Sequence, residues 1–374
     1  MSLSRTFIMG AVLLLAALLI LGCAFYLVVC VHRFSCFQTL SESKNFLSWA
    51  LASGLVLLLG LFAFINVPTL LVILLHLVAG FLLLDAVGLF FHALHLPLSA
   101  NVKGILALSL TATYLGIGCF LAFHVFETRY ALTTDKPLDR DLRLVAIADA
   151  HLGVTLDGQR FARQMERVQA AKPDLVVIVG DFVDDDTKKE DMLLACRALG
   201  SLNTTYGVYF VYGNHDNGYY AYRDFSSEEL RAALEENGVV VLTDEMRLID
   251  DSFYLIGRRD RSMTGRLSAA ALMEGVDRSK FAILLDHQPN DYAAETAAGA
   301  DLVLSGHTHG GHIFPAGPMG LWMHANDRIY GRETRSGTTF IVTSGISGWA
   351  IPIKTGTFSE YAVIDIYGKE AVPI

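Results

Sequence analysis

The chain has 374 residues, of which 53% are hydrophobic and 18% are charged, and its formal net charge is −9 at pH 7. This composition is too apolar for one soluble domain, and an acidic chain without a run of Lys and Arg is not expected to bind nucleic acid. Only one of the five cysteines, Cys196, lies beyond residue 130, which excludes a disulfide framework there and fits a reducing compartment.

Apolar residues concentrate in residues 1–130, which contain five Lys/Arg and three Asp/Glu. Four stretches in this part approach the ~20 apolar residues that cross a bilayer core. They are residues 7–31, 46–67, 70–94 and 104–125. The first is longer than the ~7–15-residue core of a signal peptide. Residues 1–130 are therefore predicted to form a four-helix transmembrane region.

The third stretch contains three ionisable residues, His76, Asp85 and His92, of which Asp85 and His92 lie two helical turns apart on nearly the same face. Ionisable groups inside a span are often functional. A face that points into the four-helix bundle or up to the interface is the simpler interpretation, and it is the one preferred.

The distribution of positive charge predicts the orientation in the membrane. Four spans place both ends of the chain on one side, where Lys and Arg near span ends are more frequent than on the other. On the side of the chain ends these residues are Arg5, Arg129, Lys136, Arg140 and Arg143, and on the other side they are Arg33, Lys44 and Lys103. The positive-inside rule therefore predicts that residues 131–374 are cytoplasmic.

Residues 131–374 contain 24 Lys/Arg and 35 Asp/Glu, hence a formal charge of −11, and short apolar runs alternate there with helical patterns. Strands are predicted at residues 144–148, 175–179, 208–212, 246–257, 282–285, 302–304 and 361–367. Helices are predicted at residues 157–171, 188–199 and 226–237, the last after an N-cap followed by acids. The alternation predicts a layered α/β domain whose sheet is mixed or doubled.

Five of the predicted strands end in polar residues. The endings are Asp149-Ala-His151, Gly180-Asp181-Phe-Val-Asp184, Gly213-Asn214-His215-Asp216, Asp286-His287 and Gly306-His307-Thr-His309. One such ending is ordinary turn chemistry, but five in succession indicate one site, since sites in α/β sheets form beyond the carboxyl ends of strands. In extended backbone, residues i and i+2 point the same way, so Asp149 with His151 and His307 with His309 are expected to converge.

This set of carboxylate, imidazole and amide groups contains no thiolate, which suits Mn, Fe or Zn at a reactive site. It is too large for one ion. Two ions ~3.5–4 Å apart that share a carboxylate can neutralise the attacking and leaving oxygens of a phosphoryl transfer. With only Asp149 and Asp181 as charged ligands, two dications leave the pocket at roughly +2, which would attract a phosphate group.

With these motifs the sequence resembles the calcineurin-like metallophosphoesterase superfamily, whose pattern D-x-H, G-D-x-x-D, G-N-H-D/E, H and G-H-x-H is present in order between Leu142 and Ile366. The resemblance implies, over residues 131–374, a sandwich of two mixed sheets flanked by helices. It implies metal ligands at Asp149, His151 and His309 for one ion, at Asn214, His287 and His307 for the other, and at Asp181 as the bridge. It further implies that His215 contacts the scissile phosphate and assists the leaving group, with Asp216 orienting it.

Residues 286–289 and 306–311 are similar to a membrane-associated bacterial branch that includes UDP-2,3-diacylglucosamine pyrophosphatases of lipid A synthesis. Two departures are that His312 stands where this branch usually has Gln, and that residues 343–345 lack a common Arg, for which Lys354 is another source of a cation. The resemblance implies a lipid-linked phosphoester substrate, contact with membrane lipids, and location in a plasma (bacterial inner) membrane.

Three functions follow from these observations. The first is a lipid-headgroup phosphoesterase, and the second is a phosphodiesterase or phosphatase on a soluble substrate with the spans as an anchor. A membrane receptor with a structural metal site is disfavoured, because His215 and Asp216 would then have no role. The apolar residues 314–330 are expected either to face lipid or a partner, or to place Trp322 and Met323 in the domain core.

Overall fold

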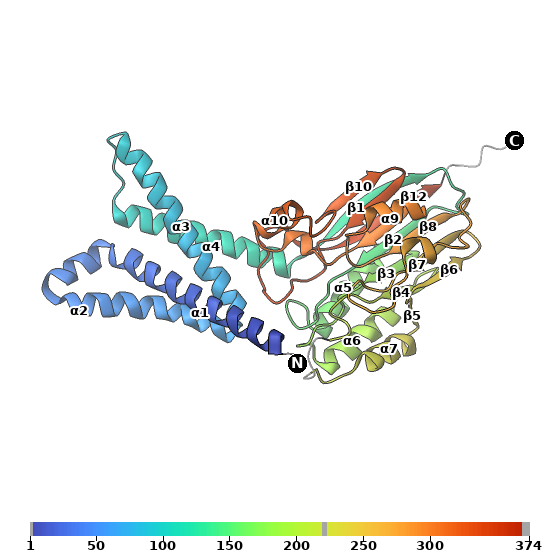
Figure 1. The fold of residues 1–374 in the computed structure, drawn as a ribbon, viewed down its shortest axis with the longest axis horizontal. Coiled ribbons are helices and arrows are strands. Elements are labelled where there is room, and N and C mark those ends of the chain that lie inside the picture. The colour runs from blue at the N-terminus through green and yellow to red at the C-terminus, as the bar shows by residue number, and fades with distance from the viewer. Residues whose placement is uncertain (1–2, 219–222, 369–374) are drawn as a thin grey trace. The chain divides into compact units, whose positions relative to one another are not determined.

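The computed structural model describes residues 3–218 and 223–368, and the chain forms two compact units, Met1–Ile117 and Gly118–Ile374. The helices of the N-terminal unit are α1 (Leu3–His32), α2 (Ser35–Leu57) with its 3₁₀ continuation η1 (Leu58–Phe64) and α3 (Val67–Ala93), and α4 (Ala100–Phe123) runs across the boundary between the units (Figure 1). Four helices are long and apolar enough to cross a membrane. The prediction of four apolar spans is therefore confirmed.

Two features of these helices differ from the expectation or refine it. Helix α2 begins eleven residues before the predicted span, and non-helical dihedral angles at Lys44 separate its first part from the apolar remainder. Asp85 of α3 accepts hydrogen bonds from Arg33 and from Lys103, each at 2.7 Å. The carboxylate of this apolar helix is thus paired within the bundle, which agrees with the simpler interpretation for Asp85, whereas His92 is exposed.

The C-terminal unit contains two six-stranded mixed sheets. The first has the order β1-β12-β2-β3-β4-β5, made of Val125–Thr134, Ser359–Gly368, Leu142–Ile147, Leu175–Val179, Val208–Val211 and Val239–Val241. The second has the order β10-β11-β9-β8-β7-β6, made of Gly331–Arg335, Thr338–Val342, Leu302–Ser305, Phe281–Leu285, Phe253–Gly257 and Glu245–Ile249. In each sheet a run of four parallel strands is joined to antiparallel neighbours.

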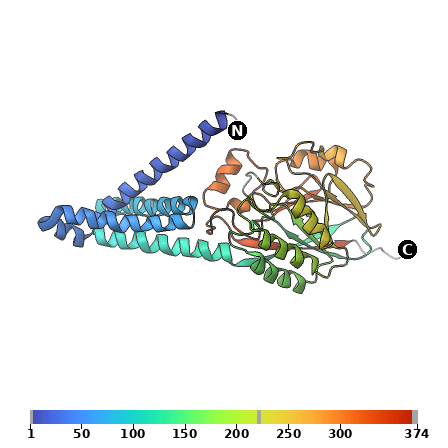
Figure 2. The same ribbon diagram turned by 90° about the horizontal axis from the view of Figure 1, so that it is seen from below.

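Alternate residues of the strands face different layers, which explains why these short runs are apolar throughout. In β3, Leu175, Val177 and Val179 pack against the second sheet, whereas Val176 and Ile178 pack against helices. The helices on that face are α5 (Gly158–Ala170), α6 (Lys189–Gly200) and α7 (Ser227–Glu236), of which α5 and α6 are green and α7 is olive-yellow in Figure 2. The outer face of the second sheet packs against α8 (Ala269–Leu272) and α9 (Tyr292–Ala298). The predicted sandwich of two mixed sheets flanked by helices is confirmed.

Strand β1 was not predicted, and it changes the expected boundary between the parts. It pairs along its whole length with β12 in parallel, from Val125 opposite Ser359 to Thr134 opposite Gly368. The predicted boundary at residue 130 therefore falls inside a strand. Only His124 separates the end of α4 at Phe123 from the start of β1.

The region predicted as one strand at residues 246–257 is an antiparallel hairpin of β6 and β7. Asp250 and Asp251 form its turn and both have positive φ, at 49° and 52°. Aspartate tolerates this conformation better than most residues. The pair of aspartates was the signal in the sequence that the strand is interrupted.

Candidate metal centre

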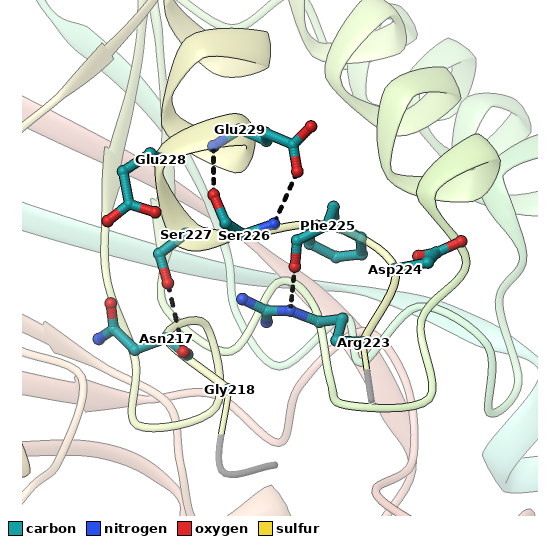
Figure 3. A pocket seen from close by; sticks show the side chains of 9 residues that line it. All are labelled: Asn217, Gly218, Arg223, Asp224, Phe225, Ser226, Ser227, Glu228 and Glu229. Carbon is teal, nitrogen blue, oxygen red and sulfur yellow. Dashed lines mark hydrogen bonds between the residues drawn. The ribbon is translucent and has the colours of Figure 1, made fainter. Parts of the chain in front are cut away.

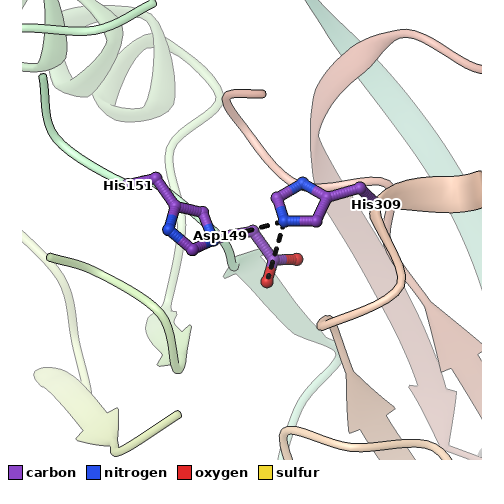
Figure 4. A group of neighbouring side chains, drawn as sticks. All are labelled: Asp149, His151 and His309. Atoms are coloured by element: carbon purple, nitrogen blue, oxygen red, sulfur yellow. Dashed lines mark hydrogen bonds and ion pairs between the residues drawn. The ribbon is translucent and has the colours of Figure 1, made fainter. Parts of the chain in front are cut away.

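The strand ends bring the predicted ligands into two groups. Strands β2, β3 and β4 are parallel neighbours, and Asp149, Asp181 and Asn214 follow them. From the second sheet, His287 follows β8, and His307 and His309 follow β9. The ligand atoms within each group lie within 4.8 Å of one another, and the groups are Asp149, His151, His309 and Asp181, His287, His307. Figure 4 shows the first group.

The distances between ligand atoms fit metal coordination. His151 Nε2 lies 3.2 Å from His309 Nε2, and Asp181 Oδ2 lies 3.1 Å from His287 Nε2. Two bonds of ~2.0–2.1 Å at a tetrahedral angle place their ligand atoms about 3.3 Å apart. The same Asp181 Oδ2 is 3.6 Å from His151 Nε2. This carboxylate oxygen therefore lies between the two groups, as a bridging ligand must.

The backbone that presents these side chains is not extended. The φ angles of Asp149, His151, Asp181, His307 and His309 are 53°, 36°, 52°, 69° and 48°. Such left-handed conformations of non-glycine residues cost ~1–3 kcal/mol each and cluster at functional sites. The argument from extended backbone was therefore wrong about the cause of convergence, since tight turns after the strands aim the ligands.

Hydrogen bonds to the end of another strand hold these turns. The N–H of Asp149 donates to the Gly180 carbonyl at 3.0 Å, and the N–H of His307 donates to the Asp149 carboxylate at 2.9 Å. Gly180 has φ of 79°, and a Cβ there would lie 2.6 Å from His287 Nδ1. A glycine is needed at this position both for the turn and for the approach of the imidazole.

Three imidazoles are oriented by a hydrogen bond from their Nδ1 to an oxygen acceptor. His287 Nδ1 lies 2.8 Å from the Val179 carbonyl, and Asp184 accepts from two rings, His151 Nδ1 at 3.1 Å and His215 Nδ1 at 3.0 Å. When Nδ1 carries the proton, Nε2 has a lone pair for a metal. Asp184 is a positioning residue to which sequence reasoning gave no role, although its place as the last residue of G-D-x-x-D was a signal.

Asp216 does not have the position expected of a partner for His215. Its buried carboxylate accepts hydrogen bonds from four backbone N–H groups, those of Asp181, Phe182, Val183 and Gly213, at 2.7–3.1 Å. These backbone N–H groups lie beyond the ends of the strands and therefore need an acceptor outside the sheet. Asp216 therefore joins the turn after β3 to the turn after β4, and Asp184 is the carboxylate against His215 Nδ1.

Asn214 lies between two residues that these turns fix. The N–H of Gly213 binds Asp216 at 2.7 Å, and the N–H of His215 binds Asp181 Oδ1 at 2.8 Å. The bridging carboxylate is thus bound to the residue that follows Asn214. This proximity is consistent with Asn214 as a ligand of the group that contains Asp181.

Burial and mutual charge set the protonation of the ligands. Burial raises the pKa of Asp149 to about 6. Burial also acts to raise the pKa of Asp181, but the charge and hydrogen bond of His287 together with the charges of His151 and His215 outweigh it and hold that pKa below its usual range. Burial lowers the pKa of His307 to about 4 and that of His309 well below its ordinary value. These two neutral imidazoles are in the form that binds metal. Burial acts to lower the pKa of His287 as well, but the charge and hydrogen bond of Asp181 and the charge of Asp149 outweigh it and raise that pKa well above its ordinary value, so a metal ion would displace a proton there.

Lys354 lies beneath the site rather than facing it. Its buried amine donates to the carbonyls of Ser344 and Gly345 at 2.7 and 3.3 Å, and burial lowers its pKa to about 7. Gly345 approaches Asp149 so closely that a Cβ would lie 2.6 Å from the Asp149 Cβ. Lys354 therefore holds the turn that supports Asp149 and is not the substrate-facing cation that replaces the missing Arg.

A separate hollow adjoins the turn after β4 (Figure 3). Arg223 Nη1 donates to the Asp216 carbonyl at 3.0 Å, and its Nε donates to the Phe225 carbonyl at 3.2 Å. Ser226 and Glu229 form a reciprocal capping box at the start of α7. The wall of this hollow therefore connects helix α7 to the turn that carries His215.

Asp184→Asn is expected to lower metal affinity by ~10–100-fold, because partners that orient a metal-binding imidazole contribute this much. Isothermal titration of the metal-free, detergent-solubilised chain with Mn²⁺ or Zn²⁺ measures the effect. Asp186→Asn is the matched control, since Asp186 is exposed on the same loop. An affinity equal to that of the control would show that Asp184 does not position the ligands.

Comparisons with known proteins match this site to one family. The calcineurin-like phosphoesterase family matches residues 142–311. An uncharacterized metallophosphoesterase of Aquifex aeolicus is 30% identical over 250 residues, which are 64% of this chain and 91% of that one. One of Campylobacter jejuni is 31% identical over 239 residues, 62% of this chain and 61% of that one, so the chain spans about three fifths of this relative. A transmembrane protein with metallophosphoesterase domain of Bos taurus is 32% identical over 241 residues, 60% of this chain and 52% of that one.

Proposed function

The chain belongs to the calcineurin-like metallophosphoesterase family, and from this premise we propose that it hydrolyses a phosphate ester or pyrophosphate bond with two divalent metal ions. The observation that carries the proposal is the position of Asp181 Oδ2, 3.1 Å from His287 Nε2 and 3.6 Å from His151 Nε2. The proposed ligands are Asp149, His151, His309 and Asp181 for one ion and Asn214, His287, His307 and Asp181 for the other. Their oxygen and nitrogen donors suit Mn, Fe or Zn.

When bound, the two ions supply Lewis acidity at phosphorus and positive charge for the attacking and leaving oxygens. His215 supplies the proton for the leaving oxygen from Nε2, since its Nδ1 is held by Asp184. Burial acts to lower the pKa of His215, but the hydrogen bond with Asp184 and the charges of Asp181, Asp184 and Asp216 together outweigh it, so the pKa is raised and the ring is more fully protonated near neutral pH. The positioned pair of His215 and Asp184 is therefore suited to general acid catalysis.

We propose that the substrate is lipid-linked, with a UDP-diacylglucosamine-type lipid A precursor as an example. The support is the short path from the fourth apolar helix to the catalytic domain. Helix α4 ends at Phe123, β1 begins at Val125, and one residue spans at most ~3.3–3.6 Å. The domain therefore begins where the apolar helix ends, which favours a substrate carried at the membrane surface.

Full-length protein in liposomes tests the substrate. A diacylated phosphoester is expected to be hydrolysed with higher kcat/KM than its deacylated analogue with the same phosphate and leaving group, because only the former is concentrated at the membrane. A bis(aryl) phosphodiester serves as the control that the site is active. Equal or better turnover of the deacylated analogue would favour a soluble phosphoester, with the spans serving only as an anchor.

We further propose that the catalytic domain lies on the cytoplasmic side of a plasma membrane, which is the inner membrane in a bacterium. The support is the excess of Lys and Arg near the span ends on that side. Protease added to sealed right-side-out vesicles should leave the domain intact, and digestion there would reverse the orientation.

A further inference from the structure

Residues 313–326 form an exposed apolar surface directly after the metal-ligand motif. They contain no Asp, Glu, Lys or Arg. They include α10 (Ala316–Trp322), in which Gly317 is the only buried residue. Trp322 and Met323 are 81% and 67% exposed, and Phe314 is 57% exposed. The alternative that Trp322 and Met323 fill the domain core is therefore excluded.

This surface is joined by hydrogen bonds to the last turns of the fourth apolar helix. The N–H of Phe314 donates to Thr355 Oγ1 at 3.0 Å, and the N–H of Thr355 donates to the His312 carbonyl at 2.9 Å. The next residue back, Lys354, donates its N–H to the carbonyl of Gly118 in α4 at 2.9 Å. A Cβ at Gly118 would lie 2.9 Å from side-chain carbons of Ile353 and Thr355. Hydrogen bonds through Lys354 and Thr355 therefore join α4, an apolar helix that can cross a membrane, to the exposed apolar surface.

The surface also adjoins the metal centre. Gly311 ends η2 (His309–Gly311), and a Cβ at Gly317 of α10 would lie 2.9 Å from Gly311 Cα. The ligand His309 and the exposed α10 are thus parts of one packed segment.

A polar hollow borders the apolar surface at Leu321. Its lining includes Arg261, Asn290 and His324. The exposed Arg261 side chain makes no hydrogen bond or ion pair within the part of the chain that the structure describes. An apolar strip with a neighbouring unpaired guanidinium matches a phospholipid, whose acyl chains and phosphate are adjacent.

We propose that residues 313–326 dock into the headgroup and acyl boundary of the bilayer that the apolar helices span, which is an inference that rests on the proposed function at a membrane. Tryptophan, methionine and leucine are side chains that enter this boundary. Docking there presents the segment of His309 to phosphate groups carried by lipids. Arg261 faces the same phosphate layer and favours anionic lipids.

Tryptophan fluorescence of the full-length chain tests the docking directly. The chain has three tryptophans, so Trp49→Phe with Trp349→Phe leaves Trp322 as the only reporter. In liposomes of phosphatidylethanolamine and phosphatidylglycerol, Trp322 emission should shift to the blue and be quenched by lipids brominated near the headgroup, but not by aqueous iodide. Quenching by iodide with no effect of brominated lipid would overturn the proposal.

A reporter on another surface provides the matched control. Met246 on β6 is 40% exposed, and Met246→Trp in a background of Trp49→Phe, Trp322→Phe and Trp349→Phe places one tryptophan there. Its emission should be quenched by iodide and not by brominated lipid. The same lipid quenching at both reporters would mean that Trp322 senses the liposome without docking, and would also overturn the proposal.

Turnover separates failure of docking from failure of the proposed function. Trp322→Ala with Met323→Ala should lower kcat/KM for a diacylated phosphoester by about tenfold or more, since burial of one such side chain is worth that factor. It should leave bis(aryl) phosphodiester hydrolysis unchanged, as should the control Met246→Ala with Leu248→Ala on both substrates. Equal turnover of the diacylated substrate by both variants would overturn the docking while the hydrolase stands. If brominated lipid quenches Trp322 but the chain hydrolyses no phosphoester, the proposed function is overturned and the docking is not.

Discussion

Asp181→Asn is expected to lose both metal ions and to abolish phosphodiester hydrolysis. Asp181 Oδ2 is the proposed bridging atom, 3.1 Å from His287 Nε2 and 3.6 Å from His151 Nε2, and the change removes its charge while it keeps the size of the side chain. Without this carboxylate each ion loses a ligand, and two dications near each other lose the anion between them. Metal analysis of the purified chain and hydrolysis of a bis(aryl) phosphodiester measure the two effects.

Chelation of the wild-type chain should reproduce the loss of activity, and added Mn, Fe or Zn should restore it in the wild type but not in Asp181→Asn. Asp186→Asn should retain metal and activity, because Asp186 is exposed two residues beyond Asp184. Full activity in the metal-free chain would contradict the proposed chemistry. Normal metal content in Asp181→Asn would instead show that Asp181 is not a bridge.

His215→Ala is expected to keep both metal ions and to lower kcat by ~10²–10⁴-fold, the usual contribution of a general acid. The ring of His215 is held at Nδ1 by Asp184 at 3.0 Å. It lies near His151 and Asp184 but belongs to neither of the two proposed metal groups, Asp149, His151, His309 and Asp181, His287, His307. Its removal therefore affects the proton given to the leaving oxygen and not the capacity for metal. Metal content and steady-state kinetics check the two statements.

The nature of the leaving group distinguishes acid catalysis from a general loss of structure. A nitrophenolate needs little protonation to depart, so His215→Ala should affect a nitrophenyl ester less than an alkyl ester. An equal loss on both esters would contradict a role in protonation. Metal loss as severe as in Asp181→Asn would make His215 a ligand and the assignment wrong.

The parts of the fold that local pattern predicts are those stabilised by short-range periodicity. Helix α7, with its Ser226 and Glu229 capping box, was predicted to within one residue at each end. Buried strands such as β3 and β8 were predicted because they are apolar on both faces. Strand β1 was missed because it directly follows the fourth apolar stretch and its partner β12 is more than 230 residues away in the chain, so the alternating burial of its residues was not recognised as that of a strand. Pairing at that separation leaves no local signal.

The sequence by itself determined the kind of chemistry, because residue type fixes which atoms can bind a metal and the order of the five motifs fixes which strand carries each. It also determined the four apolar helices, since length and hydropathy suffice for them. Only the tertiary structure decided that Asp184 rather than Asp216 faces His215, and that Trp322 is exposed. Neighbours such as His215 and Asp216 diverge in a tight turn, and burial depends on strands and turns far apart in the chain. Those contacts exist only once the two sheets have packed together.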